Sequence, residues 1–318
     1  MMNTLPYKRI LVTGACGFIG GHLVKALVNS GYAVIAYDLE NSFNITSCRF
    51  SKDISDKIEI FTGNIEDTDS LKKAAEDVGF VFHLAARSFV PDSWKNPLDF
   101  YRTNILGTAN VLEICRQNNI HLSYLSSYVY GVPEYLPVDE KHPLKSYNPY
   151  SQSKLIAEEI CDFYHNHYGL KVTIFRPFNV YGPGQNEKFL IPEIIKQVLQ
   201  KEKEMVEVND LSPKRDYIFI DDMVEALVLS ADGKDGIYNI GSGYSVSVED
   251  LIKMVMKKSG ILKKYFSKNI TRENEVYDVV ADISKVQKAL NWSVKTTLEK
   301  GIENCILYHN EKLKTHCS

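Results

Sequence analysis

The segment PYSQSK, residues 149–154, places a tyrosine four residues before a lysine where a helix is expected to begin. Side chains four residues apart lie on the same face of a helix. A tyrosine with the ordinary pKa of about 10 is almost fully protonated at neutral pH, so it needs about 4 kcal/mol of help to act as a base. A lysine charge about 4 Å away can supply roughly that much. The spacing therefore favours proton transfer by Tyr150, with Lys154 as its charged partner.

A glycine-rich turn, TGACGFIG at residues 13–20, is the second stretch with a chemical meaning. Its G-x-x-G-x-x-G spacing lies between a strand-like run and a helical pattern. Glycines there allow a tight turn and let the backbone approach a pyrophosphate, which the helix N-terminus attracts. Asp38 ends the next strand-like run, and a carboxylate at that place accepts hydrogen bonds from the adenosine ribose and repels a 2′-phosphate. We therefore expect NAD as the cofactor.

Strand-like and helical stretches alternate over residues 9–177. Short apolar runs rich in β-branched and aromatic residues lie at 9–14, 33–38, 58–64, 80–86, 121–127 and 171–177, with helical patterns at 18–31, 68–77, 98–118 and 150–168. Strands that alternate with helices form parallel sheets covered on both faces. The sequence thus predicts an α/β fold with a doubly wound parallel sheet of the Rossmann type.

This alternation changes after residue 178, where turn-forming residues and scattered helical pieces follow. We expect a smaller C-terminal α/β lobe that binds the substrate. The predicted dinucleotide-binding domain covers residues 1–178, with residues 216–241 returning to it, and the predicted substrate lobe covers residues 179–215 and 242–318.

The composition excludes several classes of function. The net charge of −3 and the pI near 6.3 give no basic surplus for nucleic acid. No apolar stretch approaches the roughly 18 residues that cross a membrane, and the early first strand leaves no room for a signal peptide, so we expect a cytoplasmic protein. The cysteines have no metal-ligand spacing, and His165 and His167 have no acidic partners in sequence, so we expect no metal site.

A tyrosine four residues before a lysine is weak evidence by itself, because a chain with 19 tyrosines produces such a pair by chance. Six motifs taken together are far more specific, and they resemble a known family. They are TGACGFIG (13–20), HLAA (83–86), TNILGT (103–108), LSSYVYG (125–131), PYSQSK (149–154) and RPFNVYGPGQ (176–185). In order and spacing, residues 8–300 resemble the extended short-chain dehydrogenase/reductases, and within these the sugar-nucleotide epimerase/dehydratase branch.

The resemblance implies roles for individual residues. Tyr150, Lys154 and Ser126 match the catalytic positions of that family. The resemblance and the glycine turn together assign cofactor contacts to Gly14, Gly17, Phe18, Ile19, Gly20, Asp38, Asn64, Ile65, Leu84, Ala85, Ala86, Asn104, Tyr150, Lys154 and Pro177. Expected contacts to a nucleotide diphosphate sugar are Ser88, Ser127, Tyr128, Asn179, Arg215 and Arg272, where each arginine could instead be an ordinary surface residue.

One departure from the family pattern bears on the reaction. Family members that eliminate water or decarboxylate carry an acidic residue three positions before the glycine of the Y-G pair, and this chain has Tyr128 there. A tyrosine does not readily replace a carboxylate as the acid for elimination. The sequence therefore favours a nucleotide-sugar 4-epimerase that oxidises the C4 hydroxyl and reduces the ketone from the opposite face.

Two alternatives stay open at this point. A 4-keto-6-deoxy nucleotide-sugar reductase would use the same serine, tyrosine and lysine with NADH or NADPH, and a non-catalytic dinucleotide-binding protein would share the fold. The sequence does not identify the nucleotide, which could be UDP, dTDP or GDP. The family resemblance implies a homodimer in which two helices of each subunit pack as a bundle.

Overall fold

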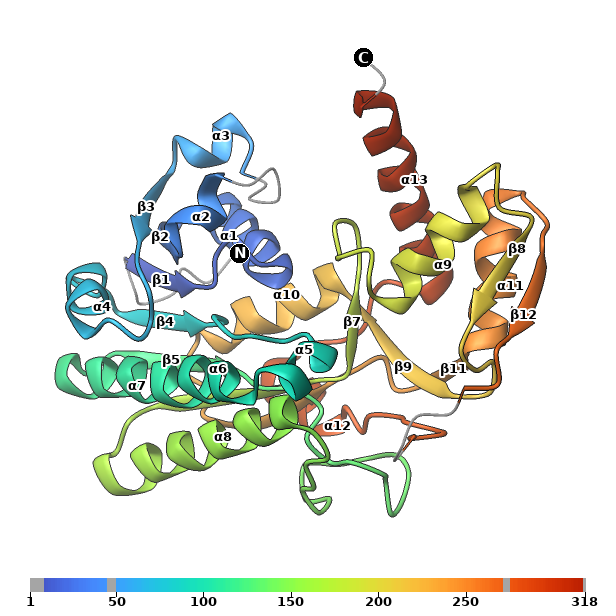
Figure 1. Cartoon of the computed structure of the whole chain (residues 1–318). Coiled ribbons are helices and arrows are strands. Elements are labelled where there is room, and N and C mark those ends of the chain that lie inside the picture. The colour runs from blue at the N-terminus through green and yellow to red at the C-terminus, as the bar shows by residue number, and fades with distance from the viewer. Residues whose placement is uncertain (1–8, 45–49, 271–274, 317–318) are drawn as a thin grey trace.

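A central parallel sheet organises the molecule (Figure 1). The computed structural model describes residues 9–44, 50–270 and 275–316. The sheet has seven parallel strands in the order β10-β6-β5-β4-β1-β2-β3. The strands are β1 (Arg9–Thr13), β2 (Ala33–Asp38), β3 (Ile58–Thr62), β4 (Phe80–His83), β5 (His121–Leu125), β6 (Val172–Pro177) and β10 (Gly236–Ile240). The predicted doubly wound α/β fold is confirmed.

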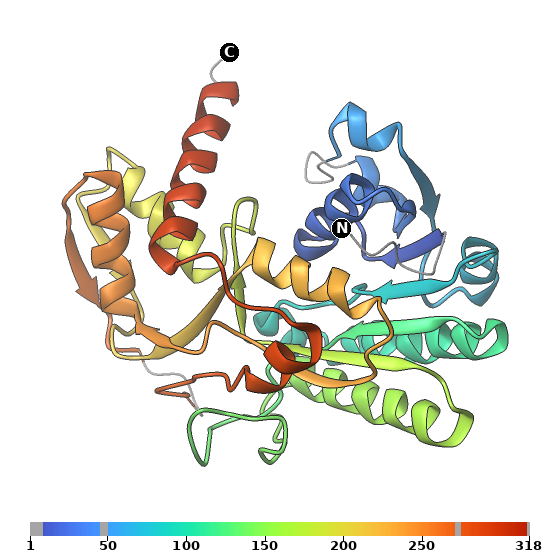
Figure 2. The ribbon, with the colours of Figure 1, turned by 180° about the vertical axis from the view of Figure 1, so that it is seen from behind.

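Helices cover both faces of this sheet (Figures 1 and 2). One face packs on α4 (Thr68–Ala74), α7 (Gly107–Asn118) and α8 (Pro149–Tyr168), and the other packs on α1 (Phe18–Asn29) and α10 (Ile220–Ser230). All residues of β4 and β5 are buried, including the polar His83, His121 and Ser123, as expected for central strands covered on both faces. The apolar strands thus form the layer that holds the loops at their carboxyl ends in place.

The smaller lobe contains two minor sheets. One pairs β11 (Ser245–Ser247), β9 (Lys214–Phe219) and β7 (Asn179–Tyr181), and the other pairs β12 (Lys264–Ser267) with β8 (Met205–Val208). Three helices pack beside them: α9 (Leu190–Leu199), α11 (Val248–Ser259) and α13 (Leu298–His316). Helix α12 (Ser284–Leu290) precedes α13 in the chain.

The segment 216–241, expected to return to the main sheet, divides between the two lobes. Strand β10 is the edge strand next to β6, and α10 packs against the main sheet. Strand β9 instead pairs with β7 and β11, so that part of the expectation is wrong. The sequence DYIFID alternates as a strand does, but this pattern does not tell which sheet the strand joins. The main sheet and the small sheet both offer a half-buried edge for pairing.

Short helices also lie in the connections between the strands. They are α2 (Glu40–Asn44), α3 (Lys52–Ser55), α5 (Val90–Lys95), α6 (Pro97–Tyr101) and a π-helical turn η1 (Arg102–Leu106) that leads into α7. The sequence predicted one helix over 98–118, and the structure divides it into three pieces. π-helical turns are rare and are frequent at functional sites, and this one carries Asn104.

The described residues contain no membrane-crossing helix and no cluster of metal-ligating side chains. None of the helices in residues 9–44, 50–270 and 275–316 is long and apolar enough to cross a membrane. Within the same ranges, no group of three or more His, Cys, Asp or Glu side chains could hold a metal ion.

Candidate active site

The tyrosine–lysine pair lies at the start of α8, whose first turn is firmly fixed. Asn148 caps the helix by accepting a hydrogen bond from the Ser151 backbone N–H at 2.8 Å, and the Ser151 hydroxyl reaches back to the Asn148 N–H. Pro149 occupies the first helical position, where its missing N–H costs nothing. The sequence NPYS therefore determines where the helix begins and where Tyr150 lies.

Lys154 is buried beneath the carboxyl end of β5. Its side chain is 3% exposed, and its Nζ donates a hydrogen bond of 2.5 Å to the Leu125 carbonyl oxygen. The same Nζ lies 4.4 Å from the centre of the Tyr124 ring. Burial lowers the pKa of Lys154 to about 7, while the charge of Glu158 raises it in part. The ammonium is thus held in place but is close to losing its proton at neutral pH.

The pKa of Tyr150 differs from the sequence-based expectation. We expected the lysine charge to lower it, but burial raises the pKa of Tyr150 to about 12, and an interaction with Ser127 offsets this only in part. The physical reason is that both groups are removed from water, which disfavours the phenolate and the ammonium alike. The protein alone therefore keeps the pair close to neutral, and a further positive charge is needed to stabilise a phenolate.

Two serine hydroxyls at the end of β5 lack hydrogen-bond partners. Ser126 is 3% exposed and Ser127 is 7% exposed, and within the described structure neither Oγ forms a hydrogen bond of normal geometry. The Ser126 backbone is fixed by an N–H bond of 2.8 Å to the Phe175 carbonyl oxygen. Buried hydroxyls usually have partners, so this pair is suited to bind a hydroxyl group brought by a ligand.

The glycine turn has the shape that a dinucleotide needs. A Cβ on Gly14 would lie 2.6 Å from the Ala85 nitrogen, and a Cβ on Gly20 would lie 2.1 Å from the Gly14 oxygen. Helix α1 has Gly17 as its N-cap, with no capping side chain and no acidic residue in its first turn, so its first N–H groups can donate hydrogen bonds to a phosphate. These features fit the pyrophosphate of NAD.

The other expected cofactor residues border this turn. Asp38, at the end of β2, accepts hydrogen bonds from the Cys16 N–H at 2.9 Å and the Leu39 N–H at 2.8 Å, so its carboxylate lies over the turn. Asn64 is exposed, whereas Ile65 is buried against Gly107. The remaining positions also follow strand ends: Phe18 and Ile19 open α1, Leu84 to Ala86 follow β4, and Pro177 ends β6.

A buried network connects the glycine turn to α8, and Asn104 was the one member of it that sequence analysis named as a candidate. His83 bridges the Thr13 hydroxyl at 2.7 Å and the Thr108 hydroxyl at 3.0 Å. Burial lowers the pKa of His83 to about 3, so it is neutral. Asn104 bonds both backbone groups of Arg87 and donates to the Ser153 hydroxyl at 2.8 Å. The HLAA motif, which begins with His83, was the sequence signal that could have pointed to this residue.

The residues expected to bind the substrate have different environments: three of them are bound to other protein groups, and one is exposed. Tyr128 donates to the Gly131 carbonyl oxygen at 2.7 Å and packs edge-on against Phe178. Asn179 donates to the Asp216 carbonyl oxygen at 3.0 Å. Arg215 is already bound to Glu275 and to the Val276 carbonyl oxygen, which the sequence did not indicate. Ser88 is exposed, and Arg272 lies outside the described residues.

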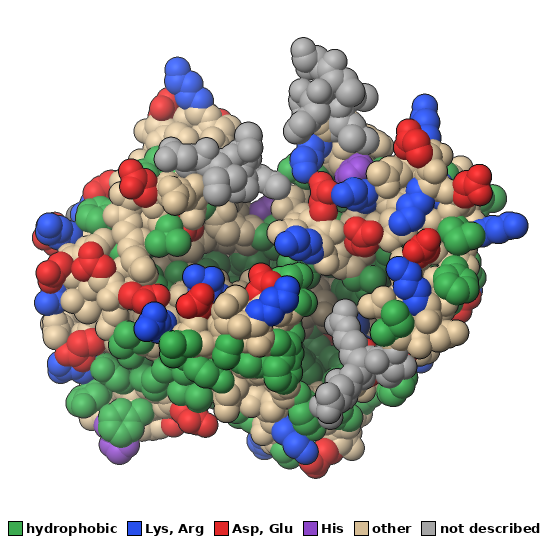
Figure 3. Space-filling view, in the orientation of Figure 1, with side chains coloured by type: hydrophobic (Ala, Val, Ile, Leu, Met, Phe, Trp, Pro, Cys, Tyr) green, Lys and Arg blue, Asp and Glu red, His purple; other side chains and the backbone are tan. Residues whose placement is uncertain are grey.

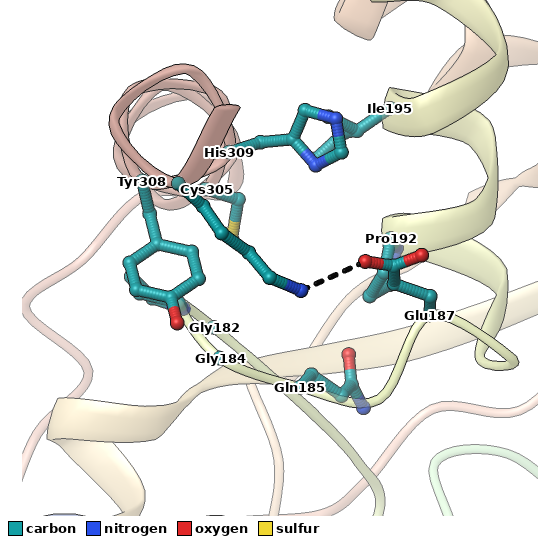
Figure 4. Close-up of a pocket in the computed structure, with 11 residues that line it drawn as sticks. Gly182, Gly184, Gln185, Glu187, Pro192, Ile195, Cys305, Tyr308 and His309 are labelled. Atoms are coloured by element: carbon teal, nitrogen blue, oxygen red, sulfur yellow. Dashed lines mark hydrogen bonds and ion pairs between the residues drawn. The ribbon is translucent and has the colours of Figure 1, made fainter. Parts of the chain in front are cut away.

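A separate hollow lies within the smaller lobe (Figure 4). It has an empty volume of about 390 Å³ and is lined by the loop after β7 and by α9 and α13. Glu187 there is bound to Lys196 at 2.9 Å and Lys312 at 3.0 Å, which lowers the pKa of its carboxyl to about 2. None of the tyrosine, lysine or serine residues of the candidate site lines this hollow.

Comparison with known proteins agrees with this arrangement. Residues 11–305 match the family model described as GDP-mannose 4,6 dehydratase. The chain is 30% identical over 330 residues to the UDP-glucose 4-epimerase of Halalkalibacterium halodurans, covering 95% of this chain and 96% of that one.

Two solved structures share the fold over nearly their whole length. The UDP-glucose 4-epimerase of Thermotoga maritima with UDP-glucose has a TM-score of 0.85 at 29% identity, covering 96% of this chain and 99% of that one. The UDP-glucuronic acid 4-epimerase of Bacillus cereus, in complex with UDP-glucuronic acid and NAD, has a TM-score of 0.85 at 31% identity over the same shares. The chain therefore belongs to the NAD-dependent sugar-nucleotide epimerase/dehydratase family of the extended short-chain dehydrogenase/reductases.

Proposed function

We propose that this protein is an NAD-dependent nucleotide-sugar 4-epimerase that acts on a UDP-hexose. The observation that carries the proposal is the pair of buried serine hydroxyls, Ser126 and Ser127, which form no hydrogen bond of normal geometry within the described part of the chain. Ser127 interacts with Tyr150, and the two serines directly follow Leu125, whose carbonyl oxygen binds Lys154. A sugar hydroxyl would satisfy these serines, and a glycine turn suited to NAD lies at the same edge of the sheet. The names of the relatives, which include UDP-glucose and UDP-glucuronate 4-epimerases, support the substrate class.

In the proposed cycle the protein holds the sugar and moves one proton. Ser126 orients the C4 hydroxyl, and Tyr150 removes its proton and later returns it. NAD held at this site would supply the hydride chemistry at C4, and the positive charge of its oxidised ring would favour the phenolate of Tyr150. The Lys154 ammonium, one helical turn after Tyr150 on α8, would favour the Tyr150 phenolate.

Cofactor binding is assigned to the edge of the main sheet. The glycine turn and the first N–H groups of α1 would hold the pyrophosphate, and Asp38 would bind the adenosine ribose and disfavour a 2′-phosphate. We propose the predicted division of labour, in which the main sheet binds the dinucleotide and the lobe with Asn179 and Arg215 binds the nucleotide diphosphate. Glu275 would have to share Arg215 with the substrate.

Tyr128 supports epimerisation over elimination. Its hydroxyl is occupied by the Gly131 carbonyl oxygen, and burial raises its pKa well above the usual value, so it does not release a proton near neutral pH. The described site thus offers the transient ketone no carboxylic acid at this position. Elimination does occur among structurally similar proteins, since one of them is an NAD-dependent NDP-hexosamine 5,6-dehydratase.

The test is a conversion assay without added reductant. Purified protein is incubated with UDP-glucose, UDP-galactose, UDP-glucuronate and the N-acetylated hexoses, and the products are separated by chromatography. The proposal predicts that one of these is interconverted with its 4-epimer and that no 4-keto-6-deoxy product accumulates. Conversion of none of them, together with mole-for-mole oxidation of NADH or NADPH by a 4-keto-6-deoxy nucleotide sugar, would instead identify a reductase.

A further inference from the structure

A buried ion pair lies one helical turn beyond the catalytic lysine. Glu158 and Arg176 have side chains that are 4% and 3% exposed, and their closest oxygen–nitrogen distance is 2.6 Å. Arg176 approaches the carboxylate with both Nε and Nη2, at 3.0 Å and 2.6 Å to the same oxygen. Two buried charges in this geometry require a strong compensating interaction. The roles proposed above for the catalytic residues leave this pair without a function.

The ion pair also connects the elements that build the site. Arg176, on β6, donates to the Tyr130 hydroxyl at 3.0 Å, and Tyr130 donates to the Asn239 side-chain oxygen of β10 at 2.5 Å. Tyr130 belongs to the segment that also carries Ser126 and Ser127. Arg176 is therefore held by β6 and by Tyr130 of the serine segment, and it fixes the Glu158 carboxylate on α8, one turn from Lys154.

Few charged groups surround Lys154. Those that act on it or lie against it are Glu158 and Cys161 on α8, Tyr124 on β5 and His83 on β4, with Arg176 of β6 behind Glu158. Tyr150 precedes it by one turn of α8. His83 is neutral, and burial strongly raises the pKa of Cys161 and Tyr124 above their usual values, so these groups are neutral as well. Glu158 is the anion of this set, and it lies one turn from the lysine on the same helix face.

We infer that Glu158, held in place by Arg176, is a positioning residue that keeps Lys154 in its charged form beneath Tyr150. Burial alone favours a neutral lysine, which could not stabilise a phenolate. A carboxylate one turn away opposes that tendency, and Arg176 prevents the carboxylate from swinging to Lys154 and displacing its bond to the Leu125 carbonyl. The inference rests on the proposed function, because the charge of Lys154 matters only if Tyr150 transfers protons.

The test compares two neighbouring acids of α8. Glu158 is buried and Glu159 is exposed, so Glu158→Gln and Glu159→Gln remove the same charge from two different environments. Protein carrying ¹³C at the lysine ε-carbon is titrated by NMR, and the Lys154 resonance is identified by its loss in Lys154→Met. We expect the midpoint for Lys154 to fall by at least about half a pH unit in Glu158→Gln, because an attractive charge is lost. Glu159→Gln should leave it unchanged.

The outcome separates an electrostatic role from a merely structural one. An unchanged midpoint in folded Glu158→Gln would overturn the inference, and Glu158 would then only tie α8 to β6. Should Glu158→Gln not fold, as judged by circular dichroism, the double variant Glu158→Gln/Arg176→Gln leaves no unpaired buried charge. Its midpoint for Lys154 should also fall, but by less, because the more distant Arg176 cation is lost together with the anion. The titration needs no substrate, so failure to convert any nucleotide sugar would count against the proposed function without deciding the role of Glu158.

Discussion

At the scale of single residues, burial dominates the chemistry of the site. It raises the pKa of Tyr150 to about 12 and lowers that of Lys154 to about 7, so both ionised forms are disfavoured before any ligand binds. The spacing of Tyr150 and Lys154 could be read from the sequence. Their pKa values could not, because these depend on how deeply the fold buries the two side chains. A polar ligand that brings positive charge is needed to shift this balance toward the phenolate.

The hydroxyl of Tyr150 is expected to be essential. Tyr150→Phe keeps the ring and its edge-on contact with Phe100, 6.4 Å between centroids, but removes the proton-transferring oxygen. Turnover should fall by at least about 10²-fold, the lower range for a general acid–base group, while NADH binding measured by fluorescence stays near wild type. Turnover above about a tenth of wild type would show that another group transfers the proton.

Buried His83 should make stability depend on pH. Its pKa is about 3 in the folded protein, against an ordinary value of 6.5, so below 6.5 the unfolded chain takes up a proton that the folded chain does not. This contribution is fully present above about pH 6.5 and is lost as the pH falls toward 3. His83→Asn should reduce the difference in unfolding free energy between pH 7.5 and 4.5 by about 3 kcal/mol.

Urea denaturation at both pH values measures this difference, and exposed His167 supplies the control. His167→Asn should leave the pH dependence as in the wild type. Equal pH dependence in His83→Asn and the wild type would mean that His83 is protonated in the fold.

At the scale of elements, the glycine turn and the start of α8 were both predictable because local sequence determines them. Gly20 has to be glycine because a Cβ would meet the Gly14 oxygen, and Asn148 and Pro149 define a helix start. The π-helical turn at Asn104 was not predictable, since nothing in TNILGT distinguishes it from an ordinary helix. The placement of β9 was missed for a similar reason, because its partners β7 and β11 are distant in sequence.

Two adjacent glycines of α1 test the cofactor cradle. A Cβ on Gly20 would lie 2.1 Å from the Gly14 oxygen, whereas a Cβ on Gly21 would lie 3.8 Å from its nearest neighbour. Gly20→Ala must therefore displace the turn, and we expect NADH affinity to fall at least tenfold, about 1.4 kcal/mol. Gly21→Ala should bind NADH as the wild type does and stabilise the helix by up to about 1 kcal/mol. Equal affinities would place the dinucleotide elsewhere.

At the scale of the whole molecule, the two lobes meet where the candidate site lies, and Figure 3 shows a recess between them. The proposed site takes the glycine turn, the serines and α8 from the main sheet, and Asn179 and Arg215 from the smaller lobe. This division stays a prediction from the sequence, which did not reveal that Glu275 binds Arg215. That contact joins residues 60 positions apart in the chain, so no local pattern could indicate it.

The exposed apolar face over α5 to α8 supports the proposed homodimer (Figure 3). Trp94, Leu98 and Leu106 are 62%, 58% and 51% exposed there. Sedimentation equilibrium should give twice the chain mass of 36.2 kDa, and Leu98→Asp/Leu106→Asp should give monomers because charges are costly in a buried interface. Leu262, 86% exposed on the smaller lobe, provides a control, since Leu262→Asp should stay dimeric. A monomeric wild type would contradict the proposal.

The fate of the hydrogen atom at C4 tests the central claim most directly. A UDP-hexose deuterated at C4, chosen from the conversion assay, is incubated with catalytic amounts of protein and no added dinucleotide, and the product is analysed by mass spectrometry and NMR. The account predicts a 4-epimer that retains deuterium at C4, because the hydride leaves for bound NAD and returns from it. An epimer whose C4 deuterium has been replaced by solvent hydrogen would contradict it.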